Sequence, residues 1–227
     1  MSAKKSWSRW GTLGAGLLGV ALMSLTASLT LGAFSATVVN PTNSFSSATI
    51  VLQQTAGSTT CDSTGGTNSI TASNSYNCTT IDDLGAAVNQ VPGGSAVSQA
   101  LTLKNVGASG ASTFTMTPGA CAQQASAGAA PYSGTSVDFC NDIDVTIQDD
   151  TVTGSPKCVY PSGSSACPAL SSSYTLNTLG AASAFSLGAL AAGASDKYTI
   201  KTQLDSGVDN TDQGLTAKLA FTWSLTQ

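Results

Sequence analysis

The sequence predicts an all-β protein, a jelly-roll or Ig-like antiparallel β-sandwich with a disulfide-tied insertion. Three observations lead to this prediction. The last segment alternates apolar and polar residues from Leu215 to Thr226, which is the period of a strand with one buried face. Ser, Thr, Ala, Gly and Asn dominate the chain, and turn-forming clusters separate several other short alternating segments. Six cysteines are available to staple the loops.

Residues 1–33 are predicted to be a signal peptide. Basic residues in the first ten positions are followed by a run without any charge, Gly11–Ala33, and this order is typical of an export signal. The run is also long enough to span a bilayer, so a retained anchor is the competing interpretation. Small residues near its end favour cleavage after Ala33. Residues 34–227 then remain as a single β-sandwich domain.

The body of the chain divides into short strands separated by turn residues. The expected strands are Ser47–Gln54, Ala96–Asn105, Ser112–Thr117, Asp142–Asp149 and Ser173–Leu179. Two segments, Ile81–Val91 and Ser183–Gly193, are the only candidates for helical turns. Residues 120–169 hold four cysteines and little periodicity, so we expect a disulfide-tied insertion around one strand.

Two strands close the chain. Tyr198, Ile200, Thr202 and Leu204 alternate with polar residues, and a second alternating segment starts at Leu215. The connector between them is built from Asp, Ser, Gly and Asn, which are turn residues. We therefore expect the two strands to be neighbours in one antiparallel sheet.

The six cysteines favour disulfides over a metal site or a redox dithiol, because their number is even, the chain carries an export signal and no C-x-x-C pair occurs. The connectivity is open from sequence alone. We expect neighbour pairing, because each pair flanks a segment rich in Gly, Ser or Asn. The expected bridges are Cys61–Cys78, Cys121–Cys140 and Cys158–Cys167.

Charge limits the classes of partner. All twelve acidic residues are aspartates outside the leader, where only five lysines and no arginine accompany them. An acidic surface argues against nucleic acid and against anionic lipid headgroups as partners. We expect contact with a membrane only through the leader, before a signal peptidase removes it.

The residue types argue against an enzyme. The chain has no histidine, which removes Ser–His–Asp and Cys–His nucleophiles. It has no glutamate either, which removes the general base of an H-E-x-x-H zinc site. The sequence therefore indicates no catalytic residue, no resident cofactor and no transition-metal site.

Calcium stays open as a ligand, because Ca²⁺ prefers carboxylate oxygens presented by turns. The acidic groups fall into two clusters without EF-hand spacing, and solvated loops are the favoured interpretation. The residues are Asp138, Asp142, Asp144, Asp149 and Asp150 in one cluster, and Asp205, Asp209 and Asp212 in the other.

The junction between leader and body resembles the TasA/camelysin family, exported proteins of Gram-positive bacteria processed by a dedicated signal peptidase. Ala33-Phe34-Ser35 matches the end of the family's leader, and Asn43 to Leu52 approximates its first strand motif. LTLKNVGASG is similar to its strand ending in Asn-x-Gly, and Gln213-Gly214 to the start of its last strand. The resemblance implies a jelly-roll subunit of a cell-surface or biofilm-matrix fibre. The cysteine-rich insertion departs from the family pattern.

The family's fibres imply that the N-terminal strand of one subunit completes the sheet of the next. Phe34, Ala36 and Val38 alternate with Ser35 and Thr37 before Asn40-Pro41, so cleavage after Ala33 would free a short donor strand. The partner is then a second copy of this chain, joined head-to-tail. The competing interpretation places this strand in its own sheet.

Two other functions stay open. A monomeric surface adhesin or carbohydrate-binding module would need exposed aromatic residues, for which the candidates are Tyr132, Tyr160 and Tyr174. Camelysin-like members of the family are often described as metalloendopeptidases, but the missing histidine and glutamate argue against this activity here. The expected location is extracellular, in the secreted fraction or at the cell surface.

Overall fold

The computed structural model describes residues 44, 46–66, 70, 74–127, 133–163 and 165–227. Residues Ser47–Gln227 form one of two compact units of the chain. The expected signal peptide and the expected donor strand with Phe34, Ala36 and Val38 lie outside the described residues. None of the helices in the described part is long and apolar enough to cross a bilayer.

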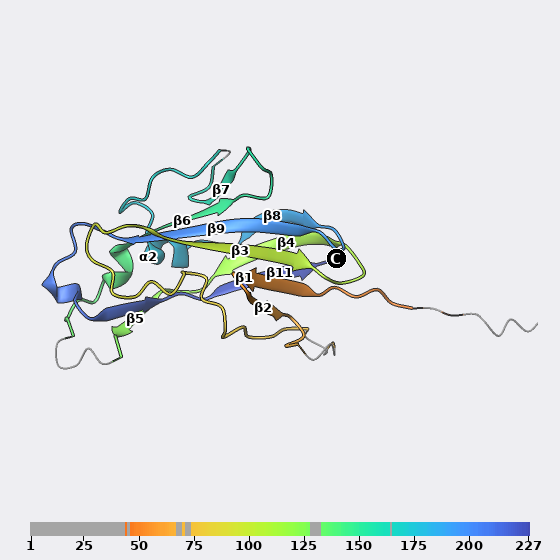
Figure 1. Cartoon of the computed structure of the whole chain (residues 1–227), viewed down its shortest axis with the longest axis horizontal. Coiled ribbons are helices and arrows are strands. Elements are labelled where there is room, and N and C mark those ends of the chain that lie inside the picture. Colours follow the sequence, from red (N-terminus) through yellow and green to blue (C-terminus); the bar gives the residue numbers. More distant parts are fainter. Residues whose placement is uncertain (1–43, 45, 67–69, 71–73, 128–132, 164) are drawn as a thin grey trace, which may run out of the picture. The chain divides into compact units, whose positions relative to one another are not determined.

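The unit from Ser47 to Gln227 is almost entirely β-structure, which confirms the all-β prediction (Figure 1). The strands are β1 (Leu52–Ala56), β2 (Thr59–Asp62), β3 (Val97–Asn105), β4 (Ala111–Pro118), β5 (Ala122–Ala125), β6 (Ile143–Asp149), β7 (Lys157–Tyr160), β8 (Phe185–Leu190), β9 (Ser195–Leu204), β10 (Leu215–Lys218) and β11 (Phe221–Thr226). The helical elements are η1 (Phe139–Asn141), α2 (Leu176–Gly180) and η2 (Asn210–Asp212). All strand ladders are antiparallel. The finer expectation of a jelly-roll connectivity stays a prediction.

Two layers of strands enclose the core. The larger sheet has the order β2-β1-β3-β9-β6-β7, and Figure 1 shows its long strands β3, β9 and β6 side by side. The other layer holds the ladders β11-β4-β8 and β10-β5. These two ladders meet where Gly119 N donates to Ala220 O at 2.7 Å. The ring of Tyr198 in β9 lies 5.4 Å from that of Trp223 in β11, so the layers pack directly.

The alternation of β9 explains which face it buries. Tyr198, Ile200 and Thr202 are buried, whereas Lys197 and Lys201 are exposed, as the sequence predicts. Each fully buried aliphatic or aromatic side chain contributes about 1.5–3 kcal/mol through the apolar area removed from water. The pattern in β9 therefore sets which side of the larger sheet faces the core.

The end of the chain corrects one prediction. The alternating segment from Leu215 is split at Leu219 and Ala220 into β10 and β11, and neither strand neighbours β9. Instead, β9 lies in the larger sheet and β11 in the opposite layer. The connector crosses between layers through η2, where the side chain of Asp209 accepts from Thr211 N. Alternation reports a buried face but does not report the neighbouring strand.

Two predicted elements have the wrong type: the expected strand Ser173–Leu179 contains a helix, and the expected helical turn Ser183–Gly193 contains a strand. In Ser173–Leu179 the structure has α2, because the Thr175 side chain accepts from Thr178 N while Thr175 N donates to the Thr178 hydroxyl, a capping box. In Ser183–Gly193 it has β8. β8 has a bulge at Gly188, where φ is +102°. The bulge shifts the apolar spacing away from the period of two, so the sequence pattern does not identify this strand.

The predicted helical turn in Ile81–Val91 is not a helix in the structure. Gly85 N donates to Asp82 O at 3.0 Å and closes a tight turn, in which Gly85 has φ of +80°. The predicted strand Ser47–Gln54 begins later, at Leu52. The sequence did not indicate β2, which pairs with β1 as a hairpin.

The three disulfides join consecutive cysteines, as the sequence analysis expected. The bridges are Cys61–Cys78, Cys121–Cys140 and Cys158–Cys167. The cysteine-rich segment 120–169 contributes β5, β6 and β7, more than the one expected strand. Because β6 lies between β9 and β7, this segment is part of the larger sheet.

Candidate functional site

The ends of the two larger ladders are candidate assembly sites, because an edge strand presents backbone N–H and C=O groups that another chain can pair with. The edge strands are β2 and β7 in the larger sheet and β11 and β8 in the opposite layer. Native proteins usually protect such edges with charges, bulges or covering segments.

Three of these four edges carry such protection. The short strand β2 contains the charged Asp62 and is tied by the Cys61–Cys78 bridge. The short strand β7 starts at Lys157, and its Cys158 N donates to Ser165 O at 2.8 Å. The bulge at Gly188 interrupts β8. These features make regular pairing with a further strand unfavourable.

The fourth edge, β11, carries neither a charge nor a bulge within the described part of the chain. Its six residues pair with β4 in unbroken register, from Phe221 opposite Pro118 to Thr226 opposite Thr113. The strand contains no charge and no proline. Its backbone has no second strand as partner among the described residues.

The core is also incompletely covered at β11. Met116 and Phe114 in β4 are fully buried. Their partners one strand further out, Trp223 and Leu225, are only partly buried. An additional strand beside β11 would remove more of this apolar surface from water, which is favourable.

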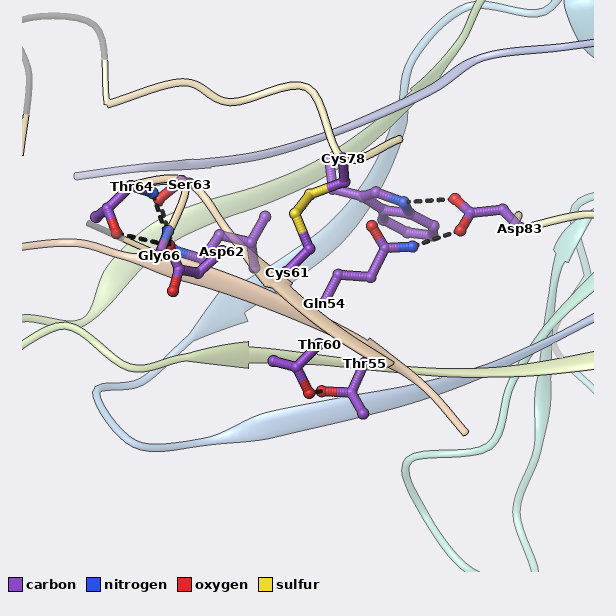
Figure 2. Close-up of a disulfide and its surroundings, with 12 residues drawn as sticks. Gln54, Thr55, Thr60, Cys61, Asp62, Ser63, Thr64, Gly66, Cys78 and Asp83 are labelled. Carbon is purple, nitrogen blue, oxygen red and sulfur yellow. Dashed lines mark hydrogen bonds between the residues drawn. A yellow bond between two sulfur atoms is a disulfide. The ribbon is translucent and has the colours of Figure 1, made fainter. Parts of the chain in front are cut away.

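Asp83 ties β11 to the opposite sheet. Figure 2 shows its carboxylate accepting from the side-chain amide of Gln54 in β1, and the indole Nε1 of Trp223 donates to Asp83 Oδ2 at 3.2 Å. Burial raises the pKa of Asp83 to about 6, the two donated hydrogen bonds oppose this rise, and the negative charge of Asp82 adds to it. Beside Gln54, the Cys61–Cys78 bridge holds the segment that leads to Asp83 (Figure 2).

The chain enters and leaves the sandwich at the same loop. Ser109 N donates to Thr49 O at 2.9 Å, just before β1. The side chain of the last residue, Gln227, donates to Ser109 Oγ. Thr49 and the end of β11 therefore contact the same loop residue, Ser109.

The structure brings some of the predicted calcium ligands together. Asp138 and Asp142 bracket η1, and Asp212 ends η2. One carboxylate oxygen from each lies within 4.8 Å of the other two. Burial, followed by the charges of Asp212, Asp138 and Asp205, raises the pKa of Asp142 to about 6. We call Asp138, Asp142 and Asp212 the acidic triad.

The other aspartates of the two predicted clusters lie outside this triad. Asp149 and Asp150 are at the far end of β6, where their side chains accept from Thr151 N and from the Thr199 hydroxyl. Asp209 caps η2. Asp144 is buried in β6, and burial and the charge of Asp205 raise its pKa. The structure therefore brings together one part of each predicted cluster and leaves the other aspartates elsewhere in the fold.

No family model matches the chain, and a search of curated proteins returns no match. The resemblance to the TasA/camelysin family therefore stays a hypothesis drawn from sequence motifs.

The predicted aromatic residues do not form a binding patch among the described residues. Tyr160 is buried and its hydroxyl bonds to Thr178 Oγ1, Tyr174 is partly buried, and Tyr132 lies outside the described residues. The most exposed described aromatic residue is Tyr76, which the sequence analysis did not single out. Asp83 was not predicted either. Its one signal in the sequence was the pair of carboxylates Asp82-Asp83 between the apolar residues Ile81 and Leu84.

Proposed function

We propose that this chain is an exported structural subunit of an extracellular fibre, at the cell surface or in a biofilm matrix. In the proposed fibre, the N-terminal strand Phe34–Val39 of one subunit pairs with β11 of the next. The observation that carries the proposal is the edge position of β11, a strand that is regular, uncharged and next to incompletely buried core residues. No catalytic residue is proposed.

The chemistry of the two partners is complementary. A donated strand binds through main-chain hydrogen bonds, while alternate side chains fill pockets. Phe34, Ala36 and Val38 would lie on one face of the donor. That face would cover the apolar surface left at Trp223 and Leu225. Because the donor and the acceptor are different surfaces of one chain, repetition gives an open filament unless the rotation closes a ring.

The disulfides support export. Three bridges and no free cysteine in the described chain suit an oxidising compartment. The charge-free run Gly11–Ala33, which follows basic residues, supports export as the pattern of a signal peptide. The resemblance to the TasA/camelysin family supports the fibre by analogy.

A pair of matched variants tests the donor strand in the secreted protein. Phe34→Asp with Val38→Asp places two charges on the proposed buried face, whereas Ser35→Asp with Thr37→Asp places the same charges on the opposite face. We expect negative-stain electron microscopy to show filaments for the native protein and the second variant, and monomers for the first. N-terminal sequencing of the secreted form checks the cleavage after Ala33.

Two results would overturn the proposal. One is filaments of unchanged length from a form that begins at Asn40, which lacks the donor strand. The other is a native secreted protein that stays monomeric at every concentration tested, which would favour the monomeric surface module.

A further inference from the structure

The acidic triad joins two segments that are far apart in the sequence. Asp138 and Asp142 precede β6, and Asp212 precedes β10. Backbone hydrogen bonds hold the two segments together: Gly134 N donates to Gln213 O at 2.6 Å, and Ser136 N donates to Thr211 O at 2.9 Å. A side chain at Gly134 would collide with the Thr211 carbonyl. The two segments therefore lie close together because of backbone hydrogen bonds and because position 134 is a glycine.

The nearby cysteine bridge fixes the same region. Cys140 lies inside η1, between Asp138 and Asp142, and is bonded to Cys121 next to β5. The Ser136 hydroxyl donates to Asp138 Oδ1 at 2.7 Å. The two carboxylates of η1 are thus held by a short helical turn with a covalent link through its middle residue.

One carboxylate oxygen of Asp212 lacks a hydrogen-bond partner within the described part of the chain, although a hydrogen bond joins the side chains of Asp142 and Asp212. Asp212 is 8% exposed. Its Oδ1 atom is buried and accepts no hydrogen bond within the described part of the chain. A buried charged oxygen without a partner costs several kcal/mol, and buried charges in proteins are paired or coordinate a metal. The charges that act on Asp142 are those of Asp212, Asp138 and Asp205, which are all negative.

We propose that the acidic triad of Asp138, Asp142 and Asp212 binds one Ca²⁺ ion. Ca²⁺ takes oxygen ligands at about 2.3–2.6 Å, so two oxygens bound to one ion are at most about 5 Å apart. The triad oxygens, within 4.8 Å of one another, meet this limit. Ca²⁺ also accepts irregular coordination completed by water, whereas Mg²⁺ demands a near-ideal octahedron. The site is independent of the proposed fibre function.

The position of the proposed Ca²⁺ site indicates that the ion would have a structural role. Asp212 lies in the crossover from β9 to β10, which joins the two layers, and Asp142 leads directly into β6 of the larger sheet. Ca²⁺ would bridge the crossover and the start of β6. Its attraction for the three carboxylates would replace the repulsion between them. The ion would therefore stabilise the folded protein under extracellular conditions.

Calcium titration of the disulfide-bonded secreted protein tests the site. Calorimetry should show one saturable Ca²⁺ site with a Kd on the order of 10⁻⁴–10⁻³ M, the range of extracellular modules. At 10 mM Ca²⁺ the Tm should rise by about 3–6 °C, and EDTA should reverse the rise. Asp142→Asn and Asp212→Asn should each abolish both effects. The matched control Asp149→Asn, which removes the same charge at the far end of β6, should retain them.

A measurement on the native protein keeps the test independent of how the variants fold. In two-dimensional amide NMR spectra, Ca²⁺ should shift resonances of residues 134–142 and 205–213 and leave β7 and β8 unchanged. Three results overturn the proposal: no saturable binding up to 10 mM Ca²⁺, shifts confined to other regions, or an equal response to Mg²⁺ or to NaCl of the same ionic strength.

Discussion

The indole Nε1 of Trp223 donates a hydrogen bond to Asp83 Oδ2 at 3.2 Å, and so connects the last strand of one layer to a loop bonded to β1 of the other. Asp83 is thus the central acceptor of a bridge between the two sheets. It lies beside the edge to which we assign assembly, so its chemistry affects both the stability and the accessibility of β11.

Acidification should stabilise the protein through Asp83. Its pKa is about 6 in the folded protein, above the ordinary aspartate value of 3.8, so the folded state binds the proton more tightly than the unfolded state does. The stabilisation is complete below pH 3.8 and is lost as the pH rises through 6. We expect the free energy of unfolding from urea titrations to be about 1–3 kcal/mol higher at pH 4 than at pH 7.5 from this group.

The variant Asp83→Asn isolates this contribution. Asparagine does not titrate and retains a side-chain oxygen that accepts one hydrogen bond. The difference between the native and variant stability curves should therefore change with pH between 4 and 6. Two parallel curves would show that Asp83 does not titrate in this range.

Replacing Trp223 with phenylalanine should weaken the bridge but keep an aromatic ring against Tyr198. The variant Trp223→Phe removes the only hydrogen-bond donor of the indole, and its smaller ring also loses some contact. We expect a loss of about 1–3 kcal/mol in the free energy of unfolding. The apparent pKa of Asp83 should rise further, measured by NMR titration, because a bond that favours the carboxylate is gone.

Buried Asn105 should tolerate aspartate poorly. Its Nδ2 donates to Ser109 O at 2.8 Å and to Leu190 O at 3.1 Å, and its Oδ1 accepts from Gly107 N. Asn105→Asp replaces both donors with an acceptor that faces two carbonyl oxygens. We expect a loss of about 3 kcal/mol or more at pH 7 by urea denaturation. A loss below 1 kcal/mol would contradict this hydrogen-bond assignment.

The bulge in β8 should require glycine. Gly188 has φ of +102°, and an added Cβ would meet no atom within 4 Å, so Gly188→Ala tests the backbone conformation alone. We expect a destabilisation of about 1–3 kcal/mol in thermal unfolding. The control Gly163→Ala, where the nearest atoms lie at 3.7 Å and φ is ordinary, should be close to neutral.

Trp223 should report donor-strand binding directly. Only three tryptophans occur in the chain, and Trp7 and Trp10 lie in the expected leader. In the form that begins at Asn40, a peptide with the sequence of Phe34–Val39 should shift the Trp223 emission to shorter wavelength, because an added strand excludes water from β11. A peptide of the same composition without the alternation should leave the emission unchanged.

Sequence periodicity predicted the faces of the strands better than their neighbours. The alternation in β9 and β6 identified real strands, because side chains on a strand point to opposite faces whatever lies beside it. The same argument failed to place β11 relative to β9, since pairing depends on contacts between distant segments. It also failed at Gly188, where one extra residue breaks the period.

The candidate sites depend even more on long-range contacts. Asp142 and Asp212 lie 70 positions apart in the printed sequence, and only the crossover through η2 brings their carboxylates together. The alternation of β11 showed that it was a strand, but no local pattern indicated that it lies at an edge. The residues of both sites were visible in the sequence, whereas their arrangement was not.

The pairing of consecutive cysteines has a consequence for the proposed export. A chain that crosses a membrane with its N-terminus first presents Cys61 and Cys78 before any other thiol, and each later bridge likewise joins the next two cysteines to emerge. Oxidation in order of emergence therefore gives the native bonds directly. Such a chain needs an oxidant on the far side of the membrane, but it needs no isomerase to reshuffle mispaired thiols.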